Sequence, residues 1–138
     1  MEDLYRYLCD GYTCTVLRDG APIYQSRARG VRPLLEAIDA GVDARDCTAV
    51  DSIVGRAAAL LYVYMGVRAV CAEVMSVGAR EVLAAHGIAA DAHTFAAHII
   101  NRRGDGLCPM ELATAEIDEP AAALAAVREA VRRLAAQK

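Results

Sequence analysis

The strongest feature of the hydrophobic pattern is an apolar run from Ala57 to Met75, interrupted by a glycine and two charged residues. We divide this run into a helix over Ile53–Met65 and a strand over Val67–Val74, with Gly66 ending the helix. A helix that is apolar on nearly all sides is expected to lie against a sheet and beneath a further layer. The interruptions make a membrane span a poor interpretation, since a spanning helix needs about 20 predominantly apolar residues.

The N-terminal part of the chain has the pattern of a hairpin. The short runs Thr13–Leu17 and Ala21–Tyr24 are separated by a segment ending in Asp-Gly at positions 19 and 20, a strong signal for a tight hairpin turn. Pro22 predicts an edge position for the second strand, because proline cannot donate a hydrogen bond to a neighbouring strand.

The remaining elements alternate between helix and strand. They are a short first helix over Asp3–Cys9, a helix over Pro33–Ala40, a strand over Cys47–Val50, a helix from Ser76 to Ala85, a strand over His93–Ala96, and a final helix after Pro120 whose apolar stripe is Leu124, Val127, Val131 and Leu134. Helix-to-strand-to-helix passages imply right-handed crossovers and partly parallel strands. We therefore predict an α/β fold, a three-layer mixed sheet between helices in a single domain over residues 1–138.

Composition narrows the functional classes. The 138 residues carry a formal charge of −3, so no overall positive charge recruits nucleic acid or an anionic membrane. The five cysteines form no C-x-x-C pair, and the acidic N-terminus resembles no signal peptide. These features predict reduced thiols in a cytoplasmic protein with neither nucleic acid nor membrane as a partner.

The segment around Asp51 is the first candidate site. We expect Asp51 or Ser52 to cap the apolar helix, and free backbone N–H groups at such a junction favour an anion. Gly55 suggests the close approach of a strand or ligand, and Arg56, in a helix suited to burial, needs an anionic partner. The alternative is that this segment has no ligand: Asp51 is an ordinary helix cap, Gly55 is a packing contact, and the Arg56 side chain reaches the solvent.

The second candidate site lies between Ile99 and Glu111. Cys108 precedes a proline that can open a helical turn, which would place its thiol at a helix N-terminus, where thiolates are stabilised. Asn101 and Arg102 offer donors for a carboxylate, a phosphate or a nucleobase edge. In the enzymatic version Cys108 is the nucleophile and Asp51 the acid/base. The alternative is a surface turn whose cysteine only packs.

A metal site is not expected. His86, His93 and His98 have neither the i, i+4 spacing of a helical metal pair nor the i, i+2 spacing of a strand pair. The sequence therefore predicts no metal ligands and implies no cofactor.

Three motifs carry a family resemblance: D-x-I-V-G-R-A-A-A-L-L from residue 51, I-I-N-R from residue 99, and C-P-M-E from residue 108. Together they resemble the bacterial domain-of-unknown-function family 1893, and this resemblance implies a cytidine deaminase-like fold. Zinc deaminases carry H-x-E and P-C-x-x-C motifs. The corresponding positions here, Asp51–Ile53 and Val74–Val77, hold neither motif, so the resemblance does not imply zinc-dependent deamination.

Two functional hypotheses follow. In the first, the strand-to-helix junctions bind a small polar ligand, nucleotide-like by analogy with the fold, with metal-independent cysteine chemistry as an extension. The ligand-binding residues would be Ser52, Gly55, Arg56, Ser76, Asn101, Arg102 and Glu111. In the second, the protein is a non-catalytic regulatory or interaction module that forms a homo-oligomer through the apolar stripe of its last helix.

Overall fold

A computed structural model describes residues 4–100, 104, 106 and 108–136. Its centre is a five-stranded sheet in the order β2-β1-β3-β4-β5. The strands are β1 (Cys14–Arg18), β2 (Ala21–Ser26), β3 (Thr48–Val54), β4 (Ala69–Ser76) and β5 (Ala89–Ala96). Strand β1 is antiparallel to both β2 and β3, whereas β3, β4 and β5 are parallel. The predicted mixed α/β sheet is confirmed.

The hairpin of β1 and β2 forms where the sequence predicts it. Asp19 and Gly20 have φ angles of 52° and 80°, the positive values that a tight two-residue hairpin turn requires. Strand β2 lies at the edge of the sheet, which agrees with the position expected from Pro22.

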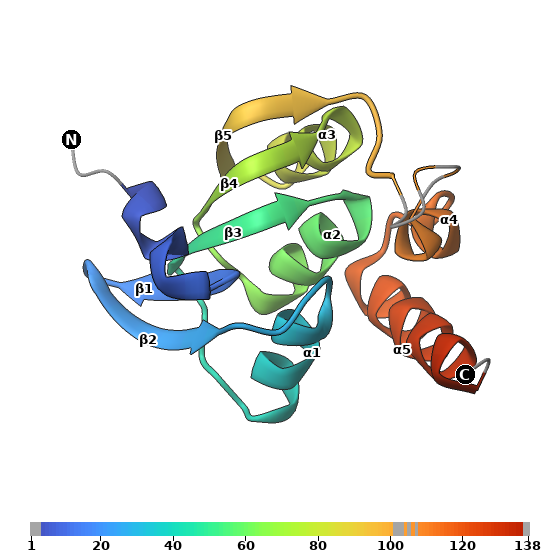
Figure 1. Ribbon diagram of the computed structural model, residues 1–138, viewed down its shortest axis with the longest axis horizontal. Coiled ribbons are helices and arrows are strands. Elements are labelled where there is room, and N and C mark those ends of the chain that lie inside the picture. The colour runs from blue at the N-terminus through green and yellow to red at the C-terminus, as the bar shows by residue number, and fades with distance from the viewer. Residues whose placement is uncertain (1–3, 101–103, 105, 107, 137–138) are drawn as a thin grey trace.

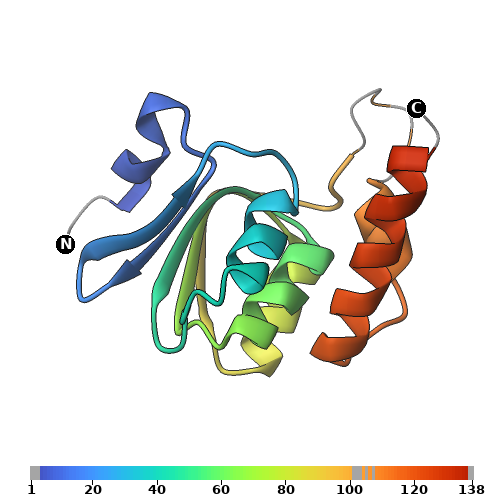
Figure 2. The same cartoon turned by 90° about the horizontal axis from the view of Figure 1, so that it is seen from below.

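Helices cover the two faces of the sheet unequally. Helices α1 (Arg32–Asp39), α2 (Arg56–Met65) and α3 (Val77–Ala85) lie on one face, as Figure 2 shows. The other face carries η1 (Leu4–Gly11), a 3-10 helix with a kink, where the sequence predicted a regular first helix. Its backbone leaves the helical region at Cys9 and Asp10.

The C-terminal segment adds a further layer on the helical side. Helix α4 (Pro109–Thr114) leads to α5 (Pro120–Ala136), which packs against α2 on the side away from the sheet (Figures 1 and 2). Helix α2 is therefore enclosed, and its residues Ala57–Tyr62 are all buried. Ala123 and Val127 of α5 are fully buried as well. The expectation that an all-apolar helix lies beneath another layer is confirmed.

The boundary between β3 and α2 differs from the prediction. Strand β3 continues through Val54, and Gly55 is the N-cap of α2, so Asp51 and Ser52 are strand residues and do not cap the helix. The pairing of β3 with β4 extends to Val54, opposite Met75, and this ladder holds the segment extended. Ser76 caps α3 as predicted, with its hydroxyl accepting a hydrogen bond of 3.0 Å from Ala79 N–H.

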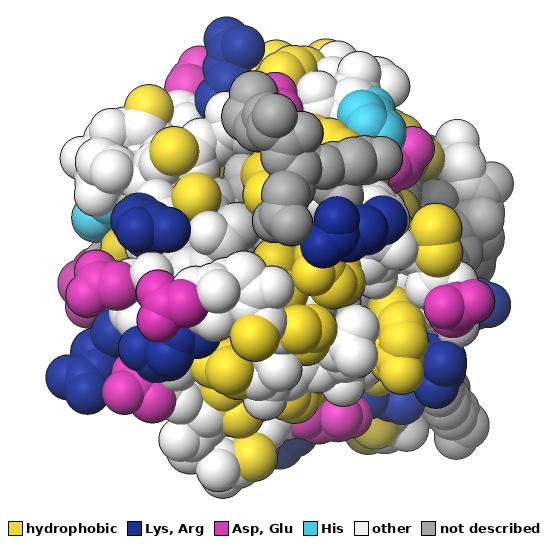
Figure 3. All heavy atoms as spheres, turned by 90° about the vertical axis from the view of Figure 1, so that its left-hand side faces the viewer, with side chains coloured by type: hydrophobic (Ala, Val, Ile, Leu, Met, Phe, Trp, Pro, Cys, Tyr) yellow, Lys and Arg dark blue, Asp and Glu magenta, His cyan; other side chains and the backbone are white. Residues whose placement is uncertain are grey.

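The surface shows no dominant charge on the side viewed in Figure 3, where acidic and basic side chains alternate around apolar patches. Among the described residues, no helix is long and apolar enough to cross a membrane.

Candidate functional site

A cavity of about 370 Å³ lies at the carboxyl end of β3, between the β2–α1 connection and α4. Four of the residues expected to bind a ligand or react with it, Ser52, Gly55, Cys108 and Glu111, line this cavity together. The other described lining residues are Thr13, Arg29, Gly30, Val31, Ile53, Ala57, Ala58, Ile99, Ile100 and Met110. The structure thus brings the two candidate segments into one site, although about 50 residues separate them in the sequence.

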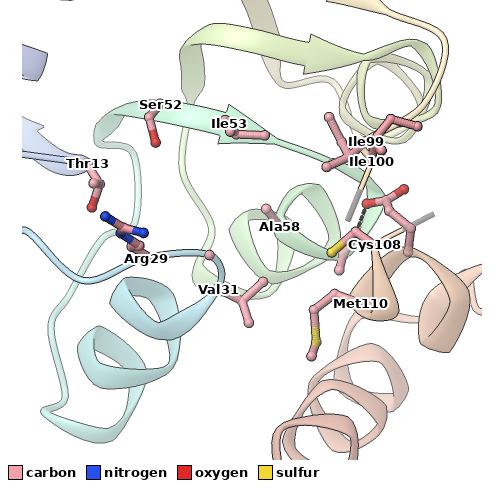
Figure 4. Close-up of a pocket in the computed structure, with 14 residues that line it drawn as sticks. Thr13, Arg29, Val31, Ser52, Ile53, Ala58, Ile99, Ile100, Cys108 and Met110 are labelled. Atoms are coloured by element: carbon pink, nitrogen blue, oxygen red, sulfur yellow. Dashed lines mark hydrogen bonds between the residues drawn. The ribbon is translucent and has the colours of Figure 1, made fainter. Parts of the chain in front are cut away.

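The cavity has different chemistry along its length, which Figure 4 shows. The side chains of Thr13, Arg29 and Ser52 lie at one end. Cys108 and Met110 lie at the other end with two isoleucines, and apolar side chains occupy the middle. A mostly apolar wall with a few polar groups is typical of small-molecule sites.

Arg29 is the cationic group among the described lining residues. Within the described part of the chain, its guanidinium group has no hydrogen-bond acceptor or salt-bridge partner. The nearby Arg27 is different, because its Nε donates to the Asp10 carbonyl at 3.0 Å and its guanidinium lies 4.1 Å from the centre of the Tyr12 ring. Arg29 is therefore available to an anion.

Glu111 reaches across from α4 to the N-terminus of α2. Its Oε1 accepts a hydrogen bond of 3.4 Å from Ala57 N–H, and its carboxyl group lies directly against Gly55. A Cβ atom at position 55 would overlap Oε1, so a group does approach Gly55 closely, but it is the Glu111 side chain and not the strand or ligand that the sequence suggested. Burial raises the pKa of Glu111, opposed by the N–H groups of Ala57 and Arg56.

Asp51 lies beneath the cavity and does not line it. Its carboxyl group is buried, with the Tyr62 hydroxyl donating a hydrogen bond of 2.5 Å to Oδ2 and Ile53 N–H donating one of 3.3 Å to Oδ1. The Cys14 thiol lies 3.4 Å from the same hydroxyl oxygen. Burial raises the pKa of Asp51 to about 7, against the lowering effect of these hydrogen bonds.

Arg56 also points away from the cavity, toward the connection between α4 and α5. Its guanidinium group donates to the carbonyl oxygens of Thr114 at 3.0 Å and Ile117 at 2.6 Å, and it forms a salt bridge of 2.6 Å with Asp118. The expected anionic partner of Arg56 is present, and it belongs to the protein itself.

The other expected site residues are distributed differently. Ser76 is buried as the cap of α3 and does not line the cavity. Asn101 and Arg102 lie outside the described residues. Within the described part of the chain, no group of three or more His, Cys, Asp or Glu side chains is placed to hold a metal ion.

Two polar lining residues, Thr13 and Arg29, were not recognised in the sequence. Thr13 directly precedes β1, and Arg29 lies in the connection between β2 and α1, so both reach the cavity only because the β1–β2 hairpin is paired with β3. The glycine that follows Arg29 was only a weak signal in the sequence, although Gly30 has a φ of 66° and forms a sharp turn before α1.

The fold and the cavity together define an α/β protein with a candidate binding site where a sheet meets its helices. The chain belongs to the DUF1893 family, since the family model described as "TM1506: Domain of unknown function (DUF1893)" matches residues 5–131. No curated protein matches the sequence.

The solved structures similar to this chain include the following two. One is the crystal structure of a DUF1893 family protein (TM1506) from Thermotoga maritima, with a TM-score of 0.72 and 22% identity, covering 92% of this chain and 81% of that one. The other is a diaminohydroxyphosphoribosylaminopyrimidine deaminase/5-amino-6-(5-phosphoribosylamino)uracil reductase from the same organism. Its TM-score is 0.48 and its identity 17%, covering 59% of this chain and 29% of that one. The second similarity is weak, and the fold assignment rests on the first.

Proposed function

We propose that the cavity at the carboxyl end of β3 binds a small polar ligand with a ring-like body, of the size of a nucleobase or nucleoside. The observation that carries this proposal is the cavity itself, which joins Ser52, Gly55, Cys108 and Glu111 from two distant segments. Its volume of about 370 Å³ lies within the range of small-molecule sites. In this proposal the walls of the cavity are supported by Asp51, Arg56 and Ser76. Each of these side chains forms hydrogen bonds with other groups of the protein and not with a ligand.

A bulky substitution at the cavity tests this proposal. Ile53 lines the cavity and is 52% exposed, so Ile53→Trp fills the space without disturbing the core. Ile23→Trp is the matched control, because Ile23 is 43% exposed on the edge strand β2 and does not line the cavity. We expect native mass spectrometry or a thermal-shift screen of nucleobases and nucleosides to reveal a ligand for the wild type and for Ile23→Trp. Equal binding by Ile53→Trp would place the site elsewhere.

The proposal extends to chemistry at Cys108, whose thiol lines the same cavity as the Glu111 carboxyl group. A nucleophilic thiol in a ligand site should react faster than an ordinary thiol and should be protected by ligand. Cys9 is the reference, because it is exposed, whereas Cys108 is only partly exposed. We expect iodoacetamide to modify Cys108 faster than Cys9 near neutral pH, as measured by peptide mass spectrometry. If Cys108 reacts more slowly than Cys9, the cavity binds ligand without thiol chemistry.

A groove between α4 and α5 favours a second function, self-association. It has a volume of about 510 Å³, and Leu112 and Leu134 line it while remaining 61% and 38% exposed. The proposed occupant is α5 of a second copy. Two antiparallel copies of α5 related by a two-fold axis at the height of Val131 would place Glu129 of each opposite Arg133 of the other, so the ion pair of 3.3 Å that these two residues form within one α5 would be extended across the interface.

Sedimentation velocity over a range of concentrations tests this second function. We expect a dimer of the wild type and a monomer of the double variant Leu112→Lys and Leu134→Lys, because lysines oppose burial of the groove. Ile23→Lys, an equally exposed change outside the groove, should leave the dimer intact. A monomeric wild type at all concentrations would contradict self-association.

A further inference from the structure

We infer that the ligand of this cavity is a small ring compound with one negative charge, which Arg29 binds, and an N–H or O–H donor directed at Glu111. This inference rests on the proposed function, because it specifies the ligand of the same site. It excludes neutral compounds and polyphosphates as preferred ligands.

We infer the negative charge on the ligand from which of the three arginines around the site already have partners in the protein. Arg27 is held by the Asp10 carbonyl and the Tyr12 ring, and Arg56 by the α4–α5 connection. Arg29 lines the cavity and has no partner of either kind among the described residues. A guanidinium group with free donors in a cleft binds a carboxylate or phosphate oxygen well.

We infer that the ligand carries only one negative charge from the balance of charged side chains that line the cavity. Among the described lining residues, Arg29 is the single Lys or Arg, and Glu111 is the single Asp or Glu. A di- or triphosphate would bring several negative charges to one cation and lie near a carboxyl group of like charge. Since like charges in a partly enclosed site repel strongly, a monoanion fits this balance best.

We infer the N–H or O–H donor on the ligand from the end of the cavity opposite Arg29. Glu111 presents a carboxyl group there, which accepts hydrogen bonds when it is ionised. Between the ends, Val31, Ile53 and Ala58 supply apolar walls (Figure 4). Apolar walls favour a flat or ring-shaped body, and the two polar ends fix its orientation.

Matched pairs of probes test the charge assignment. Uracil and orotate share a ring, and orotate carries an additional carboxylate. Nicotinamide and nicotinate also share a ring, and nicotinate has a carboxylate in place of the neutral amide. Uridine triphosphate is the polyanionic probe. We expect ligand-observed NMR titrations to give at least about 10-fold tighter binding of the monoanion in each pair, which corresponds to about 1.4 kcal/mol. Uridine triphosphate should bind more weakly than orotate.

Variants assign the charge to Arg29. Arg29→Ala should remove the preference for the monoanions, whereas Arg32→Ala is the matched control, since Arg32 is an exposed arginine three residues away that does not line the cavity. Glu111→Ala should weaken orotate, which has N–H groups, more than benzoate, which has none. Circular dichroism melting confirms that each variant is folded.

The outcomes separate this inference from the proposed function. If neutral and monoanionic probes bind equally to the wild type, and Ile53→Trp abolishes both, the cavity is a ligand site and the charge assignment is wrong. If no probe binds to the wild type at millimolar concentration, the proposed function itself is contradicted, and this inference fails with it. If the preference survives Arg29→Ala, a different group holds the anion and the inference is overturned.

Discussion

At the scale of single residues, the absence of one side chain shapes the wall of the cavity. Gly55 has a φ of −96°, a value that any residue adopts, so its backbone conformation does not require glycine. The requirement is steric, because Glu111 Oε1 and Ile99 occupy the space that a Cβ atom would need. The glycine therefore allows α4 to place a carboxyl group over the N-terminus of α2, where negative charge is favourable.

We predict that Gly55→Ala destabilises the protein by about 1–3 kcal/mol, because the added methyl group overlaps Glu111 and alanine is a poorer N-cap than glycine. Glu111→Ala should remove most of this penalty, which a double-mutant cycle of urea unfolding measures. Gly78→Ala is the control. Gly78 lies within α3, and its nearest neighbour, Ser76 Oγ, is at an ordinary 4.0 Å, so alanine should be neutral or stabilising there. A Gly55→Ala cost that is unchanged without Glu111 would contradict this steric account.

The sequence alone predicted some of the residues that line the cavity and missed others, and individual residues show why. Gly55 and Cys108 stood out because their types are unusual in their local patterns. Arg29 did not, because an arginine before a glycine is ordinary in a loop, and its significance arises from lining the cavity without a hydrogen-bond or ion-pair partner among the described residues. Asp51 was predicted as a helix cap and as the acid/base of the site, but it is a strand residue, and its distance from the cavity depends on which way a strand residue faces.

At the scale of elements, the sequence predicted the type and order of most helices and strands. The main error is the start of α2. The run Ile53–Val54 is equally compatible with a strand or a helix, because a short apolar segment has no distinguishing period. The pairing of Ile53 with Val74 of the parallel strand β4, remote in sequence, resolves this ambiguity in favour of the strand.

The contact of Arg56 with the α4–α5 connection gives a prediction at this scale. We expect Arg56→Lys to destabilise the protein by about 1–3 kcal/mol, because one ammonium nitrogen would replace the two guanidinium nitrogens that donate separately to the Thr114 and Ile117 carbonyls. Asp118→Asn should change stability little, since the Asp118 side chain is 95% exposed and exposed ion pairs contribute little. Urea unfolding measures both, and hydrogen exchange should show earlier opening of α5 in Arg56→Lys. A larger loss in Asp118→Asn than in Arg56→Lys would show that the ion pair dominates.

At the scale of the whole molecule, the packing of α2 between the sheet and α5 has an electrostatic consequence. The enclosed helix brings Tyr62 against β3, and the Asp51 carboxyl group is thereby sealed in the core with the Cys14 thiol nearby. The pKa values of Tyr62 and Cys14 are raised by burial, and the pKa of Asp51 is raised to about 7, from 3.8 for an exposed group. The folded protein therefore holds the Asp51 proton more tightly than the unfolded chain does.

This difference predicts how the free energy of unfolding depends on pH. Because the folded pKa of Asp51 is the higher one, its contribution to stability is fully present below pH 4 and is lost as pH rises to about 7. Since one pKa unit corresponds to about 1.4 kcal/mol, the loss in the free energy of unfolding is on the order of 4 kcal/mol.

The variant Asp51→Asn tests this prediction, because asparagine keeps an acceptor for the Tyr62 hydroxyl and cannot ionise. The free energy of unfolding of Asp51→Asn should therefore fall less over this pH range. Relative to the wild type, it should rise steadily from pH 4 to 8. Asp19→Asn, in the exposed hairpin turn, should parallel the wild type. Urea unfolding at several pH values measures all three proteins, and parallel curves for Asp51→Asn and the wild type would show that the Asp51 carboxyl group does not titrate in this range.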